Sequence, residues 1–165
     1  MEGLNLKENP EMTEVYFVPP SDFMLSGVAQ DIEPSDAEEL RSSTGVDDIM
    51  AILAASRDVS FECYVATIDG RPVAVYGLSM LDHHGTFGCP WAVFTTHMRK
   101  YPKLLMRRSQ DIVSRWKKMF PFLENYVDTR NKRSIRWLKR LGFEMKETVN
   151  TEAGDQFMRF EMRNV

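Results

Sequence analysis

Apolar positions repeat along this chain at two spacings, and the changes between the spacings divide it into elements. Alternating runs, as at 156–162, place apolar side chains on one face of a strand. Spacings of three and four, as for Ile112, Val113 and Trp116, place them on one face of a helix. The pattern predicts a strand at 15–18, helices at 23–29, 34–44 and 46–57, strands at 61–68, 73–80 and 86–95, a long helix at 102–120, a strand at 122–127, a short helix at 132–141, and strands at 143–149 and 156–162.

Turn residues support this division. Asp69 and Gly70 separate two strand-like runs, which is a strong hairpin signal. Gly88 and Pro90 fall inside the run at 86–95, where they predict a bulge or bend.

Length and composition predict one domain in a reducing compartment. A chain of 165 residues with 43% hydrophobic residues can bury a proper core. Residues 1–13 are polar and are expected to form a flexible arm before a domain at 14–165. The chain shows neither a secretory signal nor an apolar run of membrane-spanning length. Its two cysteines, Cys63 and Cys89, have no metal-binding spacing, so we expect reduced thiols and no metal.

The stretch 131–143 combines a helix start, an apolar stripe and a helix stop. Asn131 can cap the helix, Ile135 and Leu138 lie on one face, and Gly142 follows the last turn. This stretch resembles the last conserved motif of the GNAT superfamily, the acetyl-CoA-dependent N-acetyltransferases. That motif runs Asn, then Ala three residues on, then Leu-Tyr, then Gly-Phe. Asn131, Gly142 and Phe143 match it.

The run 123–144 is most similar to the GNAT-like internal virion proteins of short-tailed bacteriophages. The order of predicted elements is also the GNAT order from end to end. The resemblance implies a single α/β GNAT-like domain, with a mixed, mostly antiparallel sheet flanked by helices. It further implies coenzyme A as a ligand, or a phage virion or host protein as a partner.

The first chemical demand of a GNAT enzyme is a glycine-rich cradle for the diphosphate of the cofactor, before the long helix. The interval 95–102 contains no glycine, and Pro102 has no N–H to offer. Charge could replace the cradle in part. The cofactor-binding candidates are Thr95, Arg99, Lys100 and Lys103 in or beside this interval, together with Asn131, Arg133 and Ser134 at the start of the short helix.

The second and third demands are an acid for the departing thiolate and a base for the amine. The tyrosine that usually precedes the motif glycine by four residues is Leu138 here, which carries no proton. Tyr126 is a candidate substitute, although a strand tyrosine more often simply packs. His97 and Glu62, near strand ends, are candidates for the base; a loop histidine without a role is as frequent as one with a role.

Charge is unevenly distributed although the formal net charge is only −3. Residues 97–140 hold 14 Lys and Arg against 3 Asp and Glu. This imbalance suits an anionic ligand, a nucleic acid or simply two solvated helix faces. Nucleic-acid binding is disfavoured, because Trp116 and Trp137 sit beside apolar stripes and no recognition motif is present.

Two functions remain open from the sequence. The first is an internal virion or morphogenesis protein of a phage, built on a GNAT fold with a degraded acetyl-CoA site. The alternative is an active acetyl-CoA-dependent N-acetyltransferase with an atypical pyrophosphate loop. Either protein would be expected in the host cytoplasm, and the first also in the virion. The missing glycines and the leucine at the tyrosine position favour the first.

Overall fold

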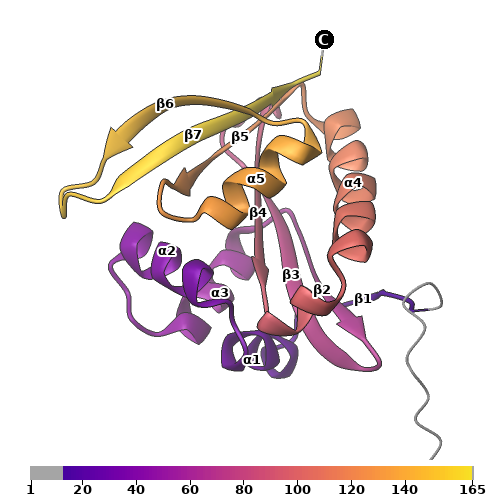
Figure 1. The fold of residues 1–165 in the computed structure, drawn as a ribbon. Helices are drawn as coiled ribbons and strands as arrows, with labels where there is room; N and C mark the ends of the chain where they lie inside the picture. The colour runs from indigo at the N-terminus through magenta and orange to yellow at the C-terminus, as the bar shows by residue number, and fades with distance from the viewer. Residues whose placement is uncertain (1–12, 165) are drawn as a thin grey trace, which may run out of the picture.

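A computed structural model describes residues 13–164, and it confirms the predicted order of strands and helices (Figure 1). The predicted arm at 1–13 lies outside the described residues except for Thr13. The elements are β1 (Tyr16–Val18), α1 (Asp22–Gln30), α2 (Pro34–Thr44), α3 (Ile49–Val59), β2 (Glu62–Ile68), β3 (Arg71–Met80), β4 (Phe87–Phe94), the 3-10 helix η2 (Thr96–Lys100), α4 (Pro102–Met119), β5 (Phe122–Asp128), α5 (Lys132–Leu141), β6 (Glu144–Asn150) and β7 (Gln156–Arg163).

The strands form one 7-stranded sheet in the order β1-β2-β3-β4-β5-β7-β6. All neighbours are antiparallel except β4 and β5, which run parallel. The mixed, mostly antiparallel sheet predicted from the sequence is therefore confirmed. Parallel neighbours need a long crossover connection, and α4 provides it here.

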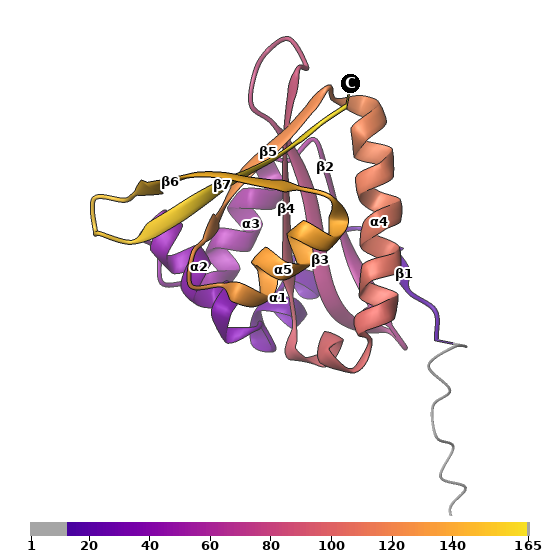
Figure 2. The same cartoon turned by 45° about the horizontal axis from the view of Figure 1, so that its top comes forward.

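Helices cover both faces of this sheet, so its central strands are buried on two sides. α4 and α5 pack on one face, and α1, α2 and α3 lie on the other (Figures 1 and 2). Alternation along β3 serves both layers: Ala74 joins the core under α4, and Val75 joins the core over α1 and α3. This arrangement buries the central residues 73–78 of β3, and the two ends of the strand are less buried.

The short helix α5 begins and ends as its sequence predicts. Asn131 accepts a hydrogen bond from the backbone N–H of Ser134 at 3.3 Å. Gly142 ends the helix at a φ of 102°, in the left-handed region that favours glycine. Ile135 and Leu138 are buried against the sheet. The stripe read from the sequence is thus the packing face of the helix.

The start of α3 was predicted wrongly, and so was a bulge in β4. α3 begins at Ile49 and not at Val46, because Asp48 caps the helix by accepting from the backbone N–H of Ala51. Val46 lies before the helix and is 43% exposed. Of the bulge or bend predicted at Gly88 and Pro90, the bulge is absent, since β3 and β4 pair without a register shift. The shift lies instead in β2, between Ala66 and Thr67.

Three further properties follow from the side chains. Cys63 and Cys89 are free and half-buried, and burial raises the pKa of each thiol to about 11. Within residues 13–164, no group of His, Cys, Asp or Glu is arranged to hold a metal ion. None of the helices in this range has the length and apolarity required to cross a membrane.

Candidate functional site

The parallel strands β4 and β5 separate soon after they begin. They pair only at Phe87 with Phe122 and at Gly88 with Leu123. Further along, the Asn125 side-chain amide bridges the gap by donating to the carbonyl of Pro90 at 2.8 Å. A side chain thus replaces the backbone ladder, and the strands diverge towards η2 and the N-terminal ends of α4 and α5 (Figure 1).

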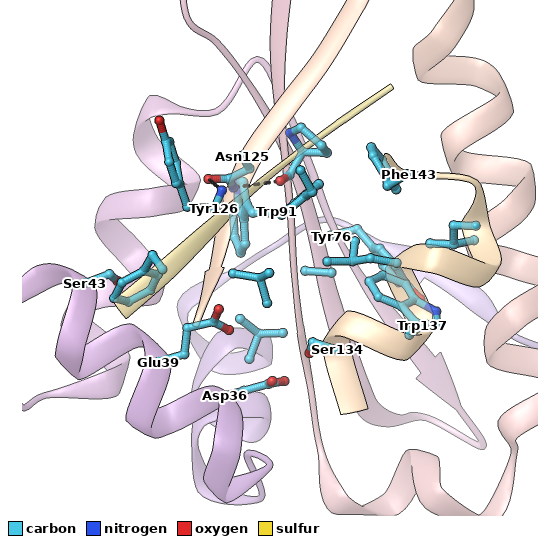
Figure 3. Close-up of a pocket in the computed structure, with 18 of the residues that line it drawn as sticks. Asp36, Glu39, Ser43, Tyr76, Trp91, Asn125, Tyr126, Ser134, Trp137 and Phe143 are labelled. Atoms are coloured by element: carbon cyan, nitrogen blue, oxygen red, sulfur yellow. Dashed lines mark hydrogen bonds between the residues drawn. The ribbon is translucent and has the colours of Figure 1, made fainter. Parts of the chain in front are cut away.

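A cavity of about 440 Å³ occupies this gap and is lined from both faces of the sheet (Figure 3). The residues on the α4 and α5 side include Tyr76, Ser109, Ser134, Trp137 and Leu138; those on the α2 side include Asp36, Glu39, Ser43, Trp91 and Tyr126. Ser43, Tyr126 and Val149 are exposed, so the cavity reaches solvent beside α2 and β6. Its volume is within the usual range for small-ligand sites.

The α4 and α5 side of the cavity is mostly apolar and contains one buried pair of hydroxyls. Tyr76 and Ser109 are 3.1 Å apart, oxygen to oxygen, and both are buried. Burial raises the pKa of the Tyr76 hydroxyl, so it stays protonated at neutral pH. Leu138, at the position of the usual motif tyrosine, is 6% exposed and packs into the core. Tyr76 is therefore a hydroxyl beside the cavity that the sequence did not indicate.

The α2 side of the cavity carries two carboxylates held by neutral donors. Asp36 accepts from the backbone N–H of Phe94 at 3.0 Å and from the Asn131 amide at 3.1 Å. Glu39 accepts from the backbone N–H of Asp128 at 2.6 Å and also from Asn131 at 3.1 Å. Burial raises the pKa of Asp36, and it raises the pKa of Glu39 to about 7. The cap residue of α5 therefore also fixes these carboxylates between β4 and β5.

The indole of Trp91 forms a fixed part of the same wall. Its Nε1 donates to the Ser60 hydroxyl at 2.9 Å. Its ring lies against Gly77 of β3, where an added Cβ would come within 2.2 Å of the ring. Any residue but glycine at this position would displace the indole.

A second cavity, of about 300 Å³, lies between the N-terminal end of α4 and the length of α5. Its wall includes Glu33, Pro102, Arg133, Arg136 and Arg140. Ser134 and Trp137 line both cavities, so the two adjoin. The basic side chains of α5 thus line a groove against α4.

Glu33, in the wall of this second cavity, is paired with two arginines. Arg99 donates to its two oxygens, at 2.7 Å each, and Arg133 donates to the same carboxylate. The Glu33 side chain is only 4% exposed. Burial acts to raise the pKa of this carboxyl, but the hydrogen bonds from Arg99 and Arg133 outweigh it, and the pKa lies below its ordinary value. Two arginines predicted to hold a cofactor therefore hold a carboxylate of the chain itself.

The backbone between β4 and α4 turns its N–H groups inward. Thr96 donates to the carbonyl of Asp31 at 2.9 Å, and Met98 donates to that of Thr95 at 3.2 Å. Tyr101 donates to Met98 at 2.9 Å, and Pro102 has no N–H. This segment is therefore a closed 3-10 turn, unlike an open loop of free N–H groups.

The structure brings some of the sequence-derived candidates together and separates others. Of the three catalytic candidates, Tyr126 lines the larger cavity and is 46% exposed. His97 lies in η2, 5.7 Å from the Tyr101 ring, outside both cavity walls. Glu62 lies at the start of β2, where it accepts from Trp116 Nε1 at 2.6 Å and pairs with Arg115. These three side chains do not converge on one site.

The cofactor candidates are closer together. Ser134 lines both cavities, Asn131 holds Asp36 and Glu39, and Arg99 and Arg133 share Glu33. Thr95 is buried and donates to the carbonyl of Val73 at 3.1 Å. Lys100 and Lys103 are exposed beyond the cavity walls.

Sequence reasoning missed the most unusual feature of the site, the buried acidic side chains of α2. From the sequence, only a helix at 34–44 was predicted, and these acids were assigned no role. Their spacing held a further signal: Glu33, Asp36 and Glu39 recur at every third residue, so they lie close to one face of the helix. No spacing could show that this face would turn towards β4 and β5.

Solved structures with a similar fold are GNAT acetyltransferases. A probable acetyltransferase of the GNAT family from Chromobacterium violaceum superposes with a TM-score of 0.71 and 16% identity, covering 91% of this chain and 83% of that chain. A GNAT-family acetyltransferase from Bacillus anthracis gives 0.69 and 10%, covering 92% and 96%. The microcin C7 self-immunity acetyltransferase MccE, solved with acetyl-CoA and AMP, gives 0.67 and 10%, covering 91% and 92%.

The sequence itself matches neither a protein-family model nor a curated protein. At identities this low, a structural likeness carries architecture and no residue roles. The superpositions extend over more than nine-tenths of this chain. The chain therefore has the fold of the GNAT-family acetyltransferases.

Proposed function

We propose that this chain is a phage internal virion or morphogenesis protein that uses a GNAT fold as a binding scaffold and has a degraded acetyl-CoA site. The observation that carries the proposal is the buried Glu33 carboxylate between Arg99 and Arg133. The phosphates of coenzyme A would require these arginines, and a carboxylate at the same place repels phosphate. The resemblance of 123–144 to internal virion proteins supplies the biological context.

The closed turn before α4 supports the same proposal. A diphosphate needs free backbone N–H groups or unpaired cations. The backbone N–H groups of Thr96, Met98 and Tyr101 donate to backbone carbonyls, and Pro102 has no N–H. The residues of this turn therefore do not fit the diphosphate of coenzyme A.

Titration with acetyl-CoA tests this proposal. We expect the wild-type chain to show weak, salt-sensitive binding or none, because the cations that remain to attract phosphate, such as Lys100, Lys103, Arg136 and Arg140, are exposed to solvent. Glu33→Gln should increase binding by releasing Arg99 and Arg133. Glu38→Gln is the matched control, since Glu38 is exposed and pairs with Arg130 at 2.8 Å, away from both cavities. Micromolar binding by the wild type that ignores salt would refute the degraded site.

The scaffold role has its own readout. We expect the chain to co-purify with phage particles or with a host protein, and reversal of exposed cations at the ends of α4 and α5 to reduce that recovery. Reversing Lys117, Lys118 and Lys139 should reduce it most if the far ends of these helices contact the partner. Unchanged recovery in every charge-reversal variant would leave the basic faces as ordinary solvated surface.

An active acetyltransferase remains the second candidate, and one specific observation favours it. Trp137 lines both cavities, and its buried Nε1 has no hydrogen-bond partner among residues 13–164. A ligand passing between the cavities could offer this N–H an oxygen. Tyr126 is the predicted acid best placed for this alternative. Thiol release from acetyl-CoA in the presence of an amine would establish it.

Nucleic-acid binding gains little support from the side chains. Trp116 is 2% exposed and Trp137 packs against the core, so neither offers a free face for base stacking. Arg115, Arg130 and Arg133 are engaged by carboxylates. The basic surface of α4 and α5 is therefore partly neutralised by the chain itself.

A further inference from the structure

Apolar side chains are exposed at one end of the sheet, away from the walls of both cavities. Phe61 precedes β2, Met80 ends β3, Leu81 follows it, and Met119 ends α4. Phe61 is 58% exposed, Met80 and Leu81 are each 51% exposed, and Met119 is 37% exposed. None of the four lines either cavity described above. Single exposed apolar residues are ordinary, but several that gather in one place indicate an interaction surface.

Backbone and ring contacts bring these segments together. The backbone N–H of Phe61 donates to the carbonyl of Leu78 at 2.8 Å, which places Phe61 beside the end of β3. The Phe61 ring lies edge-on to that of Phe120, with 6.4 Å between the ring centroids. Phe120 directly follows Met119, so the end of α4 belongs to the same cluster. Segments that are distant in the sequence therefore expose their apolar side chains at one place.

The connection between β3 and β4 projects beyond the sheet at the end of the molecule where α4 finishes (Figure 2). The Asp82 carboxylate fixes its shape by accepting from the backbone N–H groups of Thr86 and Phe87 at 3.0 Å each. The backbone N–H of Leu81 donates to the carbonyl of Phe87, also at 3.0 Å. The exposed side chains thus lie on a projecting turn of defined shape, which can enter a soft layer more readily than it can enclose a peptide.

Basic side chains lie at the same end. Lys117 and Lys118 are in the last turn of α4, and neither forms an ion pair within residues 13–164. The side-chain amide of Asn164 donates to the carbonyl of Lys117 at 2.7 Å, so the end of β7 adjoins this turn. Arg163, the last residue of β7, is exposed and pairs with Glu161 at 3.2 Å. Exposed apolar residues flanked by cations are typical of surfaces that bind anionic membranes.

We propose that this end of the molecule binds the surface of an anionic lipid bilayer. The apolar side chains enter the headgroup region, and the cations contact the phosphate and carboxylate groups of the lipids. We call this surface the hairpin end; it consists of Phe61, Met80, Leu81, Met119, Lys117, Lys118 and Arg163. It uses no residue of either cavity wall, so it stands whether the chain is a scaffold or an enzyme.

Co-sedimentation of the full-length chain with vesicles tests the proposal. Vesicles of phosphatidylcholine with about 30% phosphatidylserine are compared with vesicles of phosphatidylcholine alone, at about 0.1 M salt. We expect partitioning onto the anionic vesicles to be at least about tenfold stronger, because each cation near such a surface contributes a factor of about five. Added salt should weaken it, because exposed charges are screened. No binding to the anionic vesicles, or equal binding to both kinds, would overturn the proposal.

Charge reversal at the two ends of α4 locates the contact. Lys117→Glu combined with Lys118→Glu should lower partitioning onto anionic vesicles at least about tenfold. Lys100→Glu combined with Lys103→Glu is the matched control, since it makes the same change in charge at exposed lysines beside the opposite end of this helix. The control should change partitioning less than about threefold. Equal losses in the two double variants would show attraction by net charge alone and overturn the assignment to the hairpin end.

The apolar part of the contact has a separate test. Leu81→Ser should lower partitioning about tenfold, because the leucine side chain no longer leaves water. Phe23→Ser is the matched control and should change nothing. Phe23 is exposed on α1, and Gly27 of the same helix lies against Pro72, at the opposite end of β3. Equal partitioning of the wild type and Leu81→Ser would contradict insertion of the turn.

Insertion can also be observed directly with vesicles whose acyl chains are brominated. The fluorescence of Leu81→Trp should be quenched beyond that of the wild type, whereas that of Phe23→Trp should not. An added indole at position 81 that escapes quenching on bound protein would overturn the proposal.

A second copy of the chain is the main alternative occupant of this surface. Analytical ultracentrifugation without lipid compares the wild type with Leu81→Ser, and we expect the same association state for both. Self-association of the wild type that Leu81→Ser abolishes would make the hairpin end an interface between copies and overturn the proposal. Circular dichroism establishes that each variant is folded. Should a variant fail to fold, the wild-type comparison of the two kinds of vesicle still decides the question.

Discussion

Glu33 and Glu39 lie on one face of the same acidic segment, yet their surroundings give them opposite properties. Glu33 has two arginines, and its pKa falls below the ordinary value despite burial. Glu39 has only neutral donors and negative neighbours, and burial raises its pKa to about 7. Both carboxyls are buried, so the opposite directions of their pKa shifts come from the presence or absence of a counter-ion. Glu33 has its counter-ions within the chain, whereas Glu39 has none among the described residues.

The largest expected effect on stability comes from a substitution on the α5 side of the larger cavity, across from Asp36 and Glu39. Leu138→Asp would place a third acid in a cavity wall that already holds two carboxylates and no base. We expect a loss of about 4 kcal/mol or more in the free energy of unfolding, because an uncompensated charge replaces core packing. Chemical denaturation followed by circular dichroism measures it. Leu138→Met, which keeps the volume, should cost less than about 1.5 kcal/mol. A melting curve like that of the parent would contradict the packing of α5.

A change behind the carboxylate wall should have the next largest effect. Gly77→Ala introduces a Cβ about where the Trp91 ring now lies, so the indole must move. Overpacking of this kind costs about 2 kcal/mol and should shift tryptophan fluorescence. Adding Trp91→Leu to this variant should recover part of the loss, which a double-mutant cycle would detect as coupling. Additive effects would show that the contact is not tight in solution.

Replacing Glu33 tests how much its ion pairs with Arg99 and Arg133 contribute to stability. Glu33→Gln keeps the size of the side chain but loses the charge that Arg99 and Arg133 share. Because both arginines are partly exposed, water can replace the lost partner, and we expect a cost of about 1 to 2 kcal/mol by thermal denaturation. Glu38→Gln, at an exposed pair, should cost less than about 1 kcal/mol. Equal costs would mean that burial of Glu33 adds nothing.

The two acids should also give pH dependences of opposite sign. Glu39 has a raised pKa, so the folded state holds a proton that the unfolded chain releases near pH 4.5, and its contribution to stability is lost as pH rises from about 4.5 to 7. Glu33 has a lowered pKa, so its contribution is present above the ordinary pKa and is lost as pH falls below it.

Melting temperatures of the wild type, Glu39→Gln and Glu33→Gln between pH 3 and 8 separate these contributions. Glu39→Gln should flatten the loss above pH 4.5, and Glu33→Gln should flatten the loss at acidic pH. The same slope in all three proteins would show that neither carboxyl is perturbed.

The elements were predictable because their signals are local. The cap at Asn131, the stripe of Ile135 and Leu138 and the stop at Gly142 each depend on neighbours within a few residues, and all were found where the pattern placed them. The fold followed from the order of these elements and from the resemblance of one motif. The start of α3 at Ile49 was missed because the apolar residue Val46 was assigned to the helix, whereas Asp48 is the N-cap.

The site could be predicted only in part, because its character depends on pairings across the chain. The sequence by itself determined that the turn before α4 lacks glycine and that Leu138 replaces a tyrosine. Only the tertiary structure decided that Glu33 would meet Arg99 and Arg133, and that Asp36 and Glu39 would enter the gap between β4 and β5 without a cation. Hydrogen-bond partners and desolvation set the charge of a buried group, and both depend on segments about 60 to 100 residues apart.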